Sequence, residues 1–224
     1  MALYEELVSK LKTLSDSDYA AFHSRLLNNP KINVIGVRTP LLRKLAKEYK
    51  DSFNELLTLP DEYDEVTFLK LIVASLLPFE EFIKVVDRCV ELIDNWACCD
   101  CFKAVCIGKH KQEFLPFVKA YIGVNREFYQ RYGLVTLLHF YVEEDYLDLI
   151  FESAEKADTR YYYVHMAVAW LVAEVLVKHY DKGREYLKLQ RLDRATHNKT
   201  IAKACESYRL TKEQKTELKG LKRP

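Results

Sequence analysis

The stretch ALYEELVSKLKTLSDSDYAAFHSRLL, residues 2–27, carries the pattern that decides the fold. Its leucines recur every three or four residues, the spacing that places side chains on one face of an α-helix. These leucines are Leu3, Leu7, Leu11 and Leu14. The run Ser-Asp-Ser-Asp at 15–18 supplies N-cap residues, and Tyr19, Phe22 and Leu26 continue the helical spacing after it. The stretch therefore predicts two short amphipathic helices in succession.

The same periodicity continues along the rest of the chain, and turn-forming residues interrupt it every 8–20 residues or so, a usual helix length. The first interruption is the loop Asn28-Asn29-Pro30. Thr39-Pro40 then predicts an N-cap and a first-turn proline for a helix over 41–49. No segment alternates with period two, and no Asn-Gly or Asp-Gly pair indicates a hairpin. The sequence therefore predicts an all-α protein.

Short helices in antiparallel pairs, without a heptad repeat, favour an α-solenoid of HEAT-like antiparallel helical repeats over a four-helix bundle. No repeated sequence string accompanies them, so this prediction rests on helix length and spacing. With 224 residues the chain can bury a sizeable core without a metal ion or disulfides. We expect a single HEAT-like domain over residues 1–224.

Composition excludes several classes of protein. With 49% hydrophobic residues and a net charge of +1 the chain is not a disordered one. Only six glycines are present, and no GxGxxG or GxxxxGK[ST] string occurs, so the common phosphate-binding loops are absent. The N-terminal residues MALYEELVSK do not resemble a signal peptide, and the longest apolar stretches are too short to span a bilayer. We expect a cytoplasmic protein with reduced cysteines, no membrane partner and, in a bacterium, access to the nucleoid.

The net charge of +1 conceals an uneven distribution. Residues 178–224 carry 14 basic and 6 acidic side chains, so this part has a charge of +8 and the rest of the chain −7. Residues 31–50 add a second basic region, with six basic side chains and one acidic. Such regions can be solvated helix faces, or they can form a cationic surface for an anionic polymer, which responds to the local field.

The segment Asn95-Trp96-Ala97-Cys98-Cys99-Asp100 places two chemically unusual neighbours on one helix face. Asn95 is a good N-cap, so Trp96 begins a helix and Asp100 follows it one turn later. One interpretation is a partly buried tryptophan with Asp100 in an ion pair or a capping contact. The other is an anionic group beside an aromatic wall, which suits a cationic or electron-poor ligand.

The cysteines that follow have a spacing that superficially resembles a zinc site, Cys98-x2-Cys101-x4-Cys106-x3-His110. Four ligands converge on zinc only where the chain turns, and the segment CCDCFKAV (98–105) has no turn residue, the next being Gly108. If the helix runs on, Cys106 lies about 140° around its axis from Cys101. We therefore expect small buried thiols, no metal ion and no cofactor.

Two further features lie in the second half of the chain. Tyr163 and Trp170 share one helix face, which is more often a core stripe than a ligand site. Arg131 comes at the start of a predicted helix over 132–141, where an arginine beside an apolar stretch can contact a phosphate.

Four segments, in this order, resemble the AlkD-like DNA alkylation repair family. They are IGVRTPLLR (35–43), NWACCD (95–100), RYGLVTLL (131–138) and AVAWL (167–171). The similarity covers nearly the whole chain, including the tail from Asn198-Lys199 to Lys222-Arg223. No single segment is decisive, whereas the ordered set is fairly specific.

The resemblance implies an α-solenoid whose concave basic face binds duplex DNA, in a monomer without a cofactor. Its glycosylase members release cationic N3- and N7-alkylated purines without flipping the lesion into a tight pocket. It implies that Asp100 is catalytic and that Trp96, Trp170 and Tyr163 contact the deoxyribose or base of the lesion. It also implies that basic side chains bind the DNA phosphates: Arg131, Arg38, Arg43, Lys199 and Lys203.

One position departs from the family pattern. Glycosylase members have an arginine three residues after the second tryptophan, and this chain has Ala173. Two further functions therefore stay open beside a glycosylase. One is a non-catalytic protein that binds duplex or branched DNA or senses damage, and the other is a protein-interaction scaffold.

Overall fold

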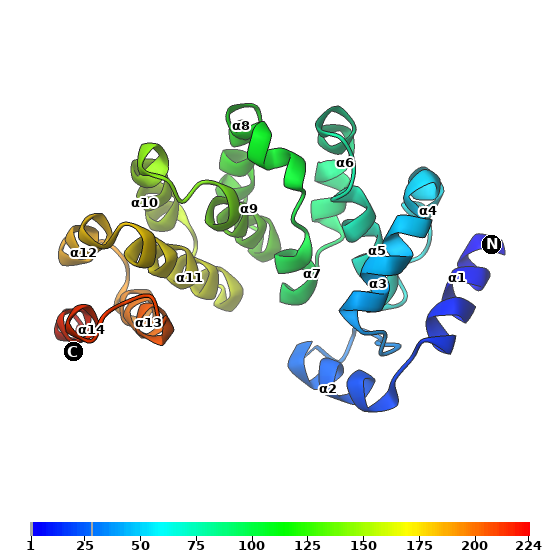
Figure 1. Ribbon diagram of the computed structural model, residues 1–224, viewed down its shortest axis with the longest axis horizontal. Helices are drawn as coiled ribbons and strands as arrows, with labels where there is room; N and C mark the ends of the chain where they lie inside the picture. Colours follow the sequence, from blue (N-terminus) through cyan, green and yellow to red (C-terminus); the bar gives the residue numbers. More distant parts are fainter. Residues whose placement is uncertain (1, 28) are drawn as a thin grey trace. The chain divides into compact units, whose positions relative to one another are not determined.

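The computed structural model describes residues 2–27 and 29–224, and every regular element in those residues is a helix (Figure 1). The all-α prediction is confirmed. The loop predicted at 28–30 includes Asn28, which lies outside the described residues. The chain divides into two compact units, Met1–Lys109 and His110–Pro224.

The first unit is built around a helix that is buried on every side. This helix is α5 (Asp64–Ala74), and it packs against α3, α4, α6 and α7. The other elements of the unit are α1 (Ala2–Thr13), α2 (Ser17–Leu27), α3 (Thr39–Glu48), η1 (Lys50–Ser52), α4 (Phe53–Leu56), α6 (Phe79–Glu91), α7 (Trp96–Cys101) and η2 (Val105–Lys109). Because α5 also carries buried polar side chains, each of these needs a partner inside the protein. Lys70, for example, donates from Nζ to the Leu59 carbonyl at 2.6 Å and to Asp61 at 2.9 Å.

The loop between α2 and α3 makes a tight turn against α5. Gly36 has a φ of 99°, and a Cβ there would lie 2.5 Å from the Asp16 carbonyl oxygen. The buried carboxylate of Glu65 accepts hydrogen bonds from the backbone N–H groups of three consecutive residues, Ile35, Gly36 and Val37. This turn explains why the IGVRTP segment has glycine at its second position.

The start of α3 differs from the prediction. The N-cap is Arg38 rather than Thr39, and Pro40 is the second residue of the helix. The Arg38 carbonyl accepts the N–H groups of Leu41 and Leu42, at 2.9 and 3.3 Å. Since no side chain caps this end, the loop that Glu65 holds determines where the helix begins.

The second unit is built around α11 (Tyr162–Lys178), which packs against α9, α10, α12 and α13. The other elements are α8 (Lys111–Gly123), α9 (Glu127–Phe140), η3 (Glu144–Tyr146), α10 (Leu147–Lys156), α12 (Tyr180–Lys188), α13 (Arg194–Glu206) and α14 (Lys212–Gly220). Helices one or two places apart in the sequence pack together, as in an α-solenoid. The HEAT-like repeat, the single domain and the concave face remain predictions.

Helix α9 begins five residues earlier than the predicted start at 132. Arg126 is its N-cap, so Arg131 lies within the helix rather than before it. None of the helices in residues 2–27 and 29–224 is long and apolar enough to cross a bilayer.

Candidate functional site

A pocket of about 190 Å³ in the first unit contains the predicted Trp96–Asp100 pair. The two side chains come from α7, and they share the pocket with residues from α2 and α5. These are Tyr19 and His23 from α2 and Asp64 and Glu65 from α5. Both Trp96 and Asp100 are half-buried. Aromatic rings and carboxylates therefore surround one cavity, as the ligand-binding interpretation of this segment requires.

Helix α7 has only six residues, and its first turn is fixed by hydrogen bonds from outside the helix. The predicted N-cap is confirmed, because Asn95 Oδ1 accepts the backbone N–H of Cys98 at 2.9 Å. The indole Nε1–H of Trp96 points to the Leu26 carbonyl at the end of α2, at 3.4 Å. The helix ends at Cys101, where the buried ring of Phe102 packs against Phe82 at 5.8 Å. The helix therefore does not run on from Cys101 to Cys106, and the angle of about 140° between these two cysteines does not apply.

Asp64, which is 6% exposed, joins three helices through its carboxylate. Oδ1 accepts the side-chain N–H of Asn95 at 2.8 Å and lies 3.5 Å from the thiol of Cys98. Oδ2 contacts Nε2 of His23 on α2 at 3.1 Å. The hydrogen bond to Asp64 raises the pKa of His23 above its usual value of 6.5. Sequence analysis missed Asp64 and His23, because nothing in the sequence pairs positions 23, 64 and 95.

The two predicted phosphate contacts of the first unit differ in their surroundings. Arg38 binds Asp16 through Nε at 3.1 Å and Nη2 at 2.7 Å, and its guanidinium lies 4.9 Å from the Tyr19 ring. The backbone N–H of Tyr19 and the Arg38 guanidinium lower the pKa of Asp16. Arg43 is exposed on α3; burial raises the pKa of the Cys101 thiol beside the pocket, and the nearby Arg43 guanidinium acts to lower it. Arg38 is thus paired with a carboxylate, whereas Arg43 lies near a thiol at the pocket.

All six cysteines are free thiols. Burial raises the pKa of Cys89 to about 12 and that of Cys98 well above its usual value of 9.0. It also raises the pKa of Cys101 and Cys106. Within the described residues, no three His, Cys, Asp or Glu side chains gather in an arrangement that could hold a metal ion.

In the second unit the structure brings Arg131 and Tyr163 together. Arg131 is 5% exposed and donates from Nη1 to the Tyr163 carbonyl at 2.8 Å. The backbone N–H of Tyr163 is held by the carboxylate of Glu127 at 2.8 Å, and its ring packs on Phe128 at 5.3 Å. Arg131 therefore fixes the first turn of α11, which carries Trp170 two turns further on.

Trp170 is half-buried and meets His139 of α9 edge to face, with ring centroids 6.2 Å apart. Ala173, three residues later, is 4% exposed and belongs to an apolar core cluster between α11, α12, α13 and α14. Its neighbours there are Leu176, Leu187, Ile201, Ala204, Leu210 and Leu218. An arginine at position 173 would meet these apolar neighbours at its Cβ.

The basic residues of α13 have different surroundings from one another. Lys199 and Lys203 are half-buried, and Lys203 lies 3.4 Å from Glu206. Arg194 donates to the Pro224 carbonyl at 2.7 Å. A hydrogen bond between His165 and Thr196 at 2.7 Å joins α11 to α13.

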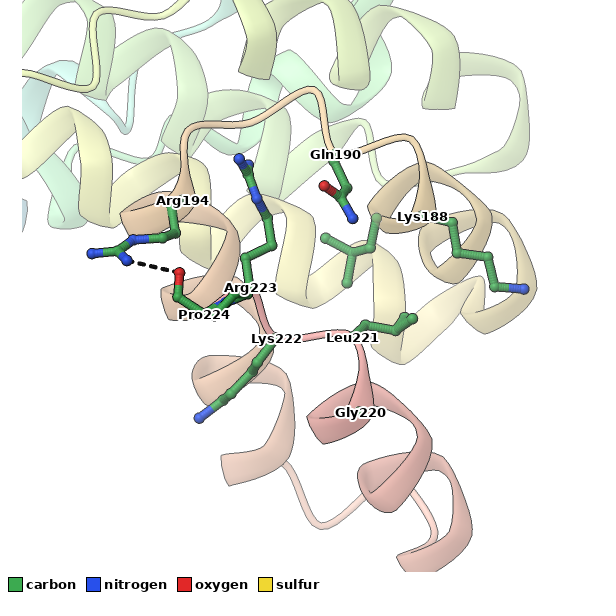
Figure 2. Close-up of a pocket in the computed structure, with 9 residues that line it drawn as sticks. Lys188, Gln190, Arg194, Gly220, Leu221, Lys222, Arg223 and Pro224 are labelled. Carbon is green, nitrogen blue, oxygen red and sulfur yellow. Dashed lines mark hydrogen bonds between the residues drawn. The ribbon is translucent and has the colours of Figure 1, made fainter.

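A second, more basic pocket of about 420 Å³ lies where the last residues run along α13 (Figure 2). Asn198 pairs with the backbone of Arg223 through both its amide atoms, at 2.8 and 2.9 Å, and His197 contacts the Leu221 carbonyl at 2.9 Å. Figure 2 shows Arg194 reaching Pro224, while the ends of Lys188 and Lys222 point away from the pocket on opposite sides. Its cations do not converge on one point.

Both units are thus all-helical in the described residues. The first has a pocket lined by Trp96 and Asp100, and in the second Arg131 holds the backbone of Tyr163 at the start of the helix that carries Trp170. The sequence matches the DNA alkylation repair enzyme family over residues 7–207, which includes every predicted site residue. The chain belongs to this family, and its role is in DNA repair. No curated protein matches the chain.

Proposed function

We infer that the protein is a monofunctional DNA glycosylase that hydrolyses the N-glycosidic bond of cationic N3- or N7-alkylated purines in duplex DNA. The observation that carries this proposal is the pocket that Trp96 and Asp100 share. An indole face and a carboxylate both attract positive charge, which the substrate carries on its base and develops on its sugar.

In this mechanism Asp100 stabilises the oxocarbenium-like transition state on the deoxyribose and orients the attacking water. The alkylated base leaves without a general acid, because its positive charge already makes it a good leaving group. Trp96, Trp170 and Tyr163 contact the lesion's deoxyribose or base. Water adds to the sugar carbon, the bond to the base breaks, and the proton of the water passes to solvent or to the carboxylate.

The proposed phosphate contacts are Arg131, Arg38, Arg43, Lys199 and Lys203. Arg43 and Lys199 support this role most directly, since no carboxylate among residues 2–27 and 29–224 is seen to pair with them, whereas Arg38 binds Asp16. The buried Arg131 acts through the position of Tyr163 as well as through its charge. We also propose that the chain works as a monomeric cytoplasmic HEAT-like domain with a concave DNA-binding face and no metal ion or cofactor.

The test is an excision assay with duplex DNA that contains a 7-methylpurine. Wild-type protein should release the base, and Asp100→Asn should abolish release with DNA affinity unchanged or higher, because the substitution removes one negative charge. The exposed Asp51→Asn serves as the matched control and should retain full activity. Absence of base release by the wild type would contradict the proposal.

A second candidate is a protein that binds DNA, duplex or branched, or senses damage without excision. The observation that favours it is the burial of Ala173 in an apolar cluster, since this leaves the position without a DNA-facing arginine. This candidate predicts salt-sensitive binding to duplex or branched DNA with no base release. Absence of DNA binding at low salt would contradict both candidates and favour a protein-interaction scaffold.

A further inference from the structure

The helix that carries Trp96 and Asp100 is too short to be stable by itself. Isolated helices of fewer than 12–15 residues or so are marginal in water, because nucleation costs more than a few hydrogen bonds return. Helix α7 has six residues, and its cap is supplied by Asn95. The positions of Trp96 and Asp100 therefore depend on contacts from outside the helix, and those that hold the Asn95 cap are among them.

Asn95 is itself buried and is held by Asp64. The Asn95 amide donates to Asp64 Oδ1 with its nitrogen and accepts the Cys98 N–H with its oxygen, so it can satisfy both only in one orientation. The thiol of Cys98, in the same turn of α7, lies at Asp64 Oδ1 as well. One carboxylate oxygen of Asp64 thus contacts both the N-cap side chain, Asn95, and a side chain of the first turn, Cys98.

The second oxygen of Asp64 is held from the opposite direction by α2. His23 contacts it at 3.1 Å, and the Tyr19 ring stacks on the His23 ring with a centroid distance of 5.6 Å. A carboxylate this deeply buried needs charged or polar partners on both oxygens. His23 holds the second oxygen of Asp64 and thereby keeps the carboxylate oriented toward Asn95.

We propose that Asp64 and His23 are positioning residues that hold α7 so that Trp96 and Asp100 face the pocket. The chain of contacts runs from His23 through the Asp64 carboxylate to Asn95 and the first turn of α7. The consequence for excision rests on the proposed glycosylase function, whereas the consequence for the orientation of Trp96 does not.

Glu65 provides a matched control on the same helix. It is the next residue, is also buried and lines the same pocket, and its hydrogen-bond donors among the described residues are the backbone N–H groups of the 35–37 loop. If Asp64 acts only by stabilising the fold, Asp64→Asn and Glu65→Gln should have the same effects. If Asp64 positions α7, the two variants should differ at Trp96.

The first experiment uses Trp96 fluorescence in a Trp170→Phe background, where Trp96 is the only tryptophan. At a temperature where all variants are folded by circular dichroism, Asp64→Asn should shift Trp96 emission to the red and increase acrylamide quenching. Glu65→Gln should leave both close to the parent. Equal changes in the two variants, or no change in Asp64→Asn, would overturn the proposal. If Asp64→Asn does not fold, His23→Leu carries the same comparison.

The second experiment measures single-turnover excision and DNA affinity separately. Asp64→Asn and His23→Leu should lower the excision rate by on the order of 10²-fold, because a displacement of about 1 Å costs that much. DNA affinity should change little. His23→Gln, whose amide nitrogen can replace Nε2 as a donor, should restore most of the rate. A rate for Asp64→Asn equal to that of the wild type would overturn the proposal, while a wild type without excision would overturn the proposed function and leave the fluorescence result standing.

Discussion

At the scale of single residues, Ala173 is buried in an apolar core cluster that suits a small side chain. Replacing it with arginine would bury an unpaired charge in an apolar cluster. We expect Ala173→Arg to lower the free energy of unfolding by about 3 kcal/mol or more. Urea unfolding monitored by circular dichroism measures this. Ala195→Arg, at an exposed position of α13, should stay within about 0.5 kcal/mol of the wild type. Equal midpoints for Ala173→Arg and wild type would contradict the burial.

The contact of His23 with Asp64 should make the free energy of unfolding depend on pH. Its folded-state pKa is raised by Asp64, so its contribution to stability is complete below the unfolded pKa of about 6.5 and is lost as pH rises through the folded pKa. The difference in unfolding free energy between wild type and His23→Gln should therefore be largest near pH 5.5 or so and shrink toward pH 9 or so. A difference that grows with pH would contradict the assignment.

At the scale of secondary structure, α7 began where it was predicted, whereas α3 and α9 did not. Asn95 caps α7 with its own side chain, which is a local signal that the sequence displays. Helices α3 and α9 have no side-chain cap, so tertiary contacts place their ends and the predicted starts were displaced. The end of α7 at Cys101 follows from the packing of Phe102 on Phe82, a contact between residues far apart in sequence.

The cap of α7 gives a prediction for the element as a whole. Asn95→Ala removes the N-cap and one donor to the buried Asp64 carboxylate. We expect a loss of about 2 kcal/mol in unfolding free energy, at the upper end for a cap, and faster hydrogen exchange at the amides of 98–101. Mass spectrometry of exchanged peptides locates the change. Uniform acceleration over α5 and α6 as well would contradict a local effect.

At the scale of the whole molecule, the sequence predicted the fold class and the Trp96–Asp100 pair, because both follow from periodicity and a local cap. The family match supports the role in DNA repair. The contacts of Asp64 and His23 could not be predicted, since they join positions 41 residues apart. Neither could the burial of Ala173 or the pairing of Arg38 with Asp16, because residue types alone do not indicate which neighbours they meet.

The uneven charge of the chain leads to a prediction about DNA binding. Each phosphate contact releases counterions, so the logarithm of the binding constant falls with the logarithm of salt by about 0.9 per contact. Arg43→Ala and Lys199→Ala should each reduce this slope by about 1. Fluorescence anisotropy with a labelled duplex over a salt series measures it. Glu48→Ala is the control. Glu48 is an exposed residue at the end of α3 that pairs with Lys10 of α1, and its removal should leave the slope unchanged or slightly steeper.

The burial of the thiols has a consequence for their reactivity toward alkylating agents. The thiolate, and not the thiol, is the nucleophile that attacks a methyl donor. Because burial raises the pKa of Cys89, Cys98, Cys101 and Cys106, these sulfur atoms stay protonated at neutral pH. Cys98 and Cys101 lie in the helix of Trp96 and Asp100, so methylation there would damage the site itself. We expect these thiols to react with a methyl donor more slowly than an exposed cysteine of ordinary pKa.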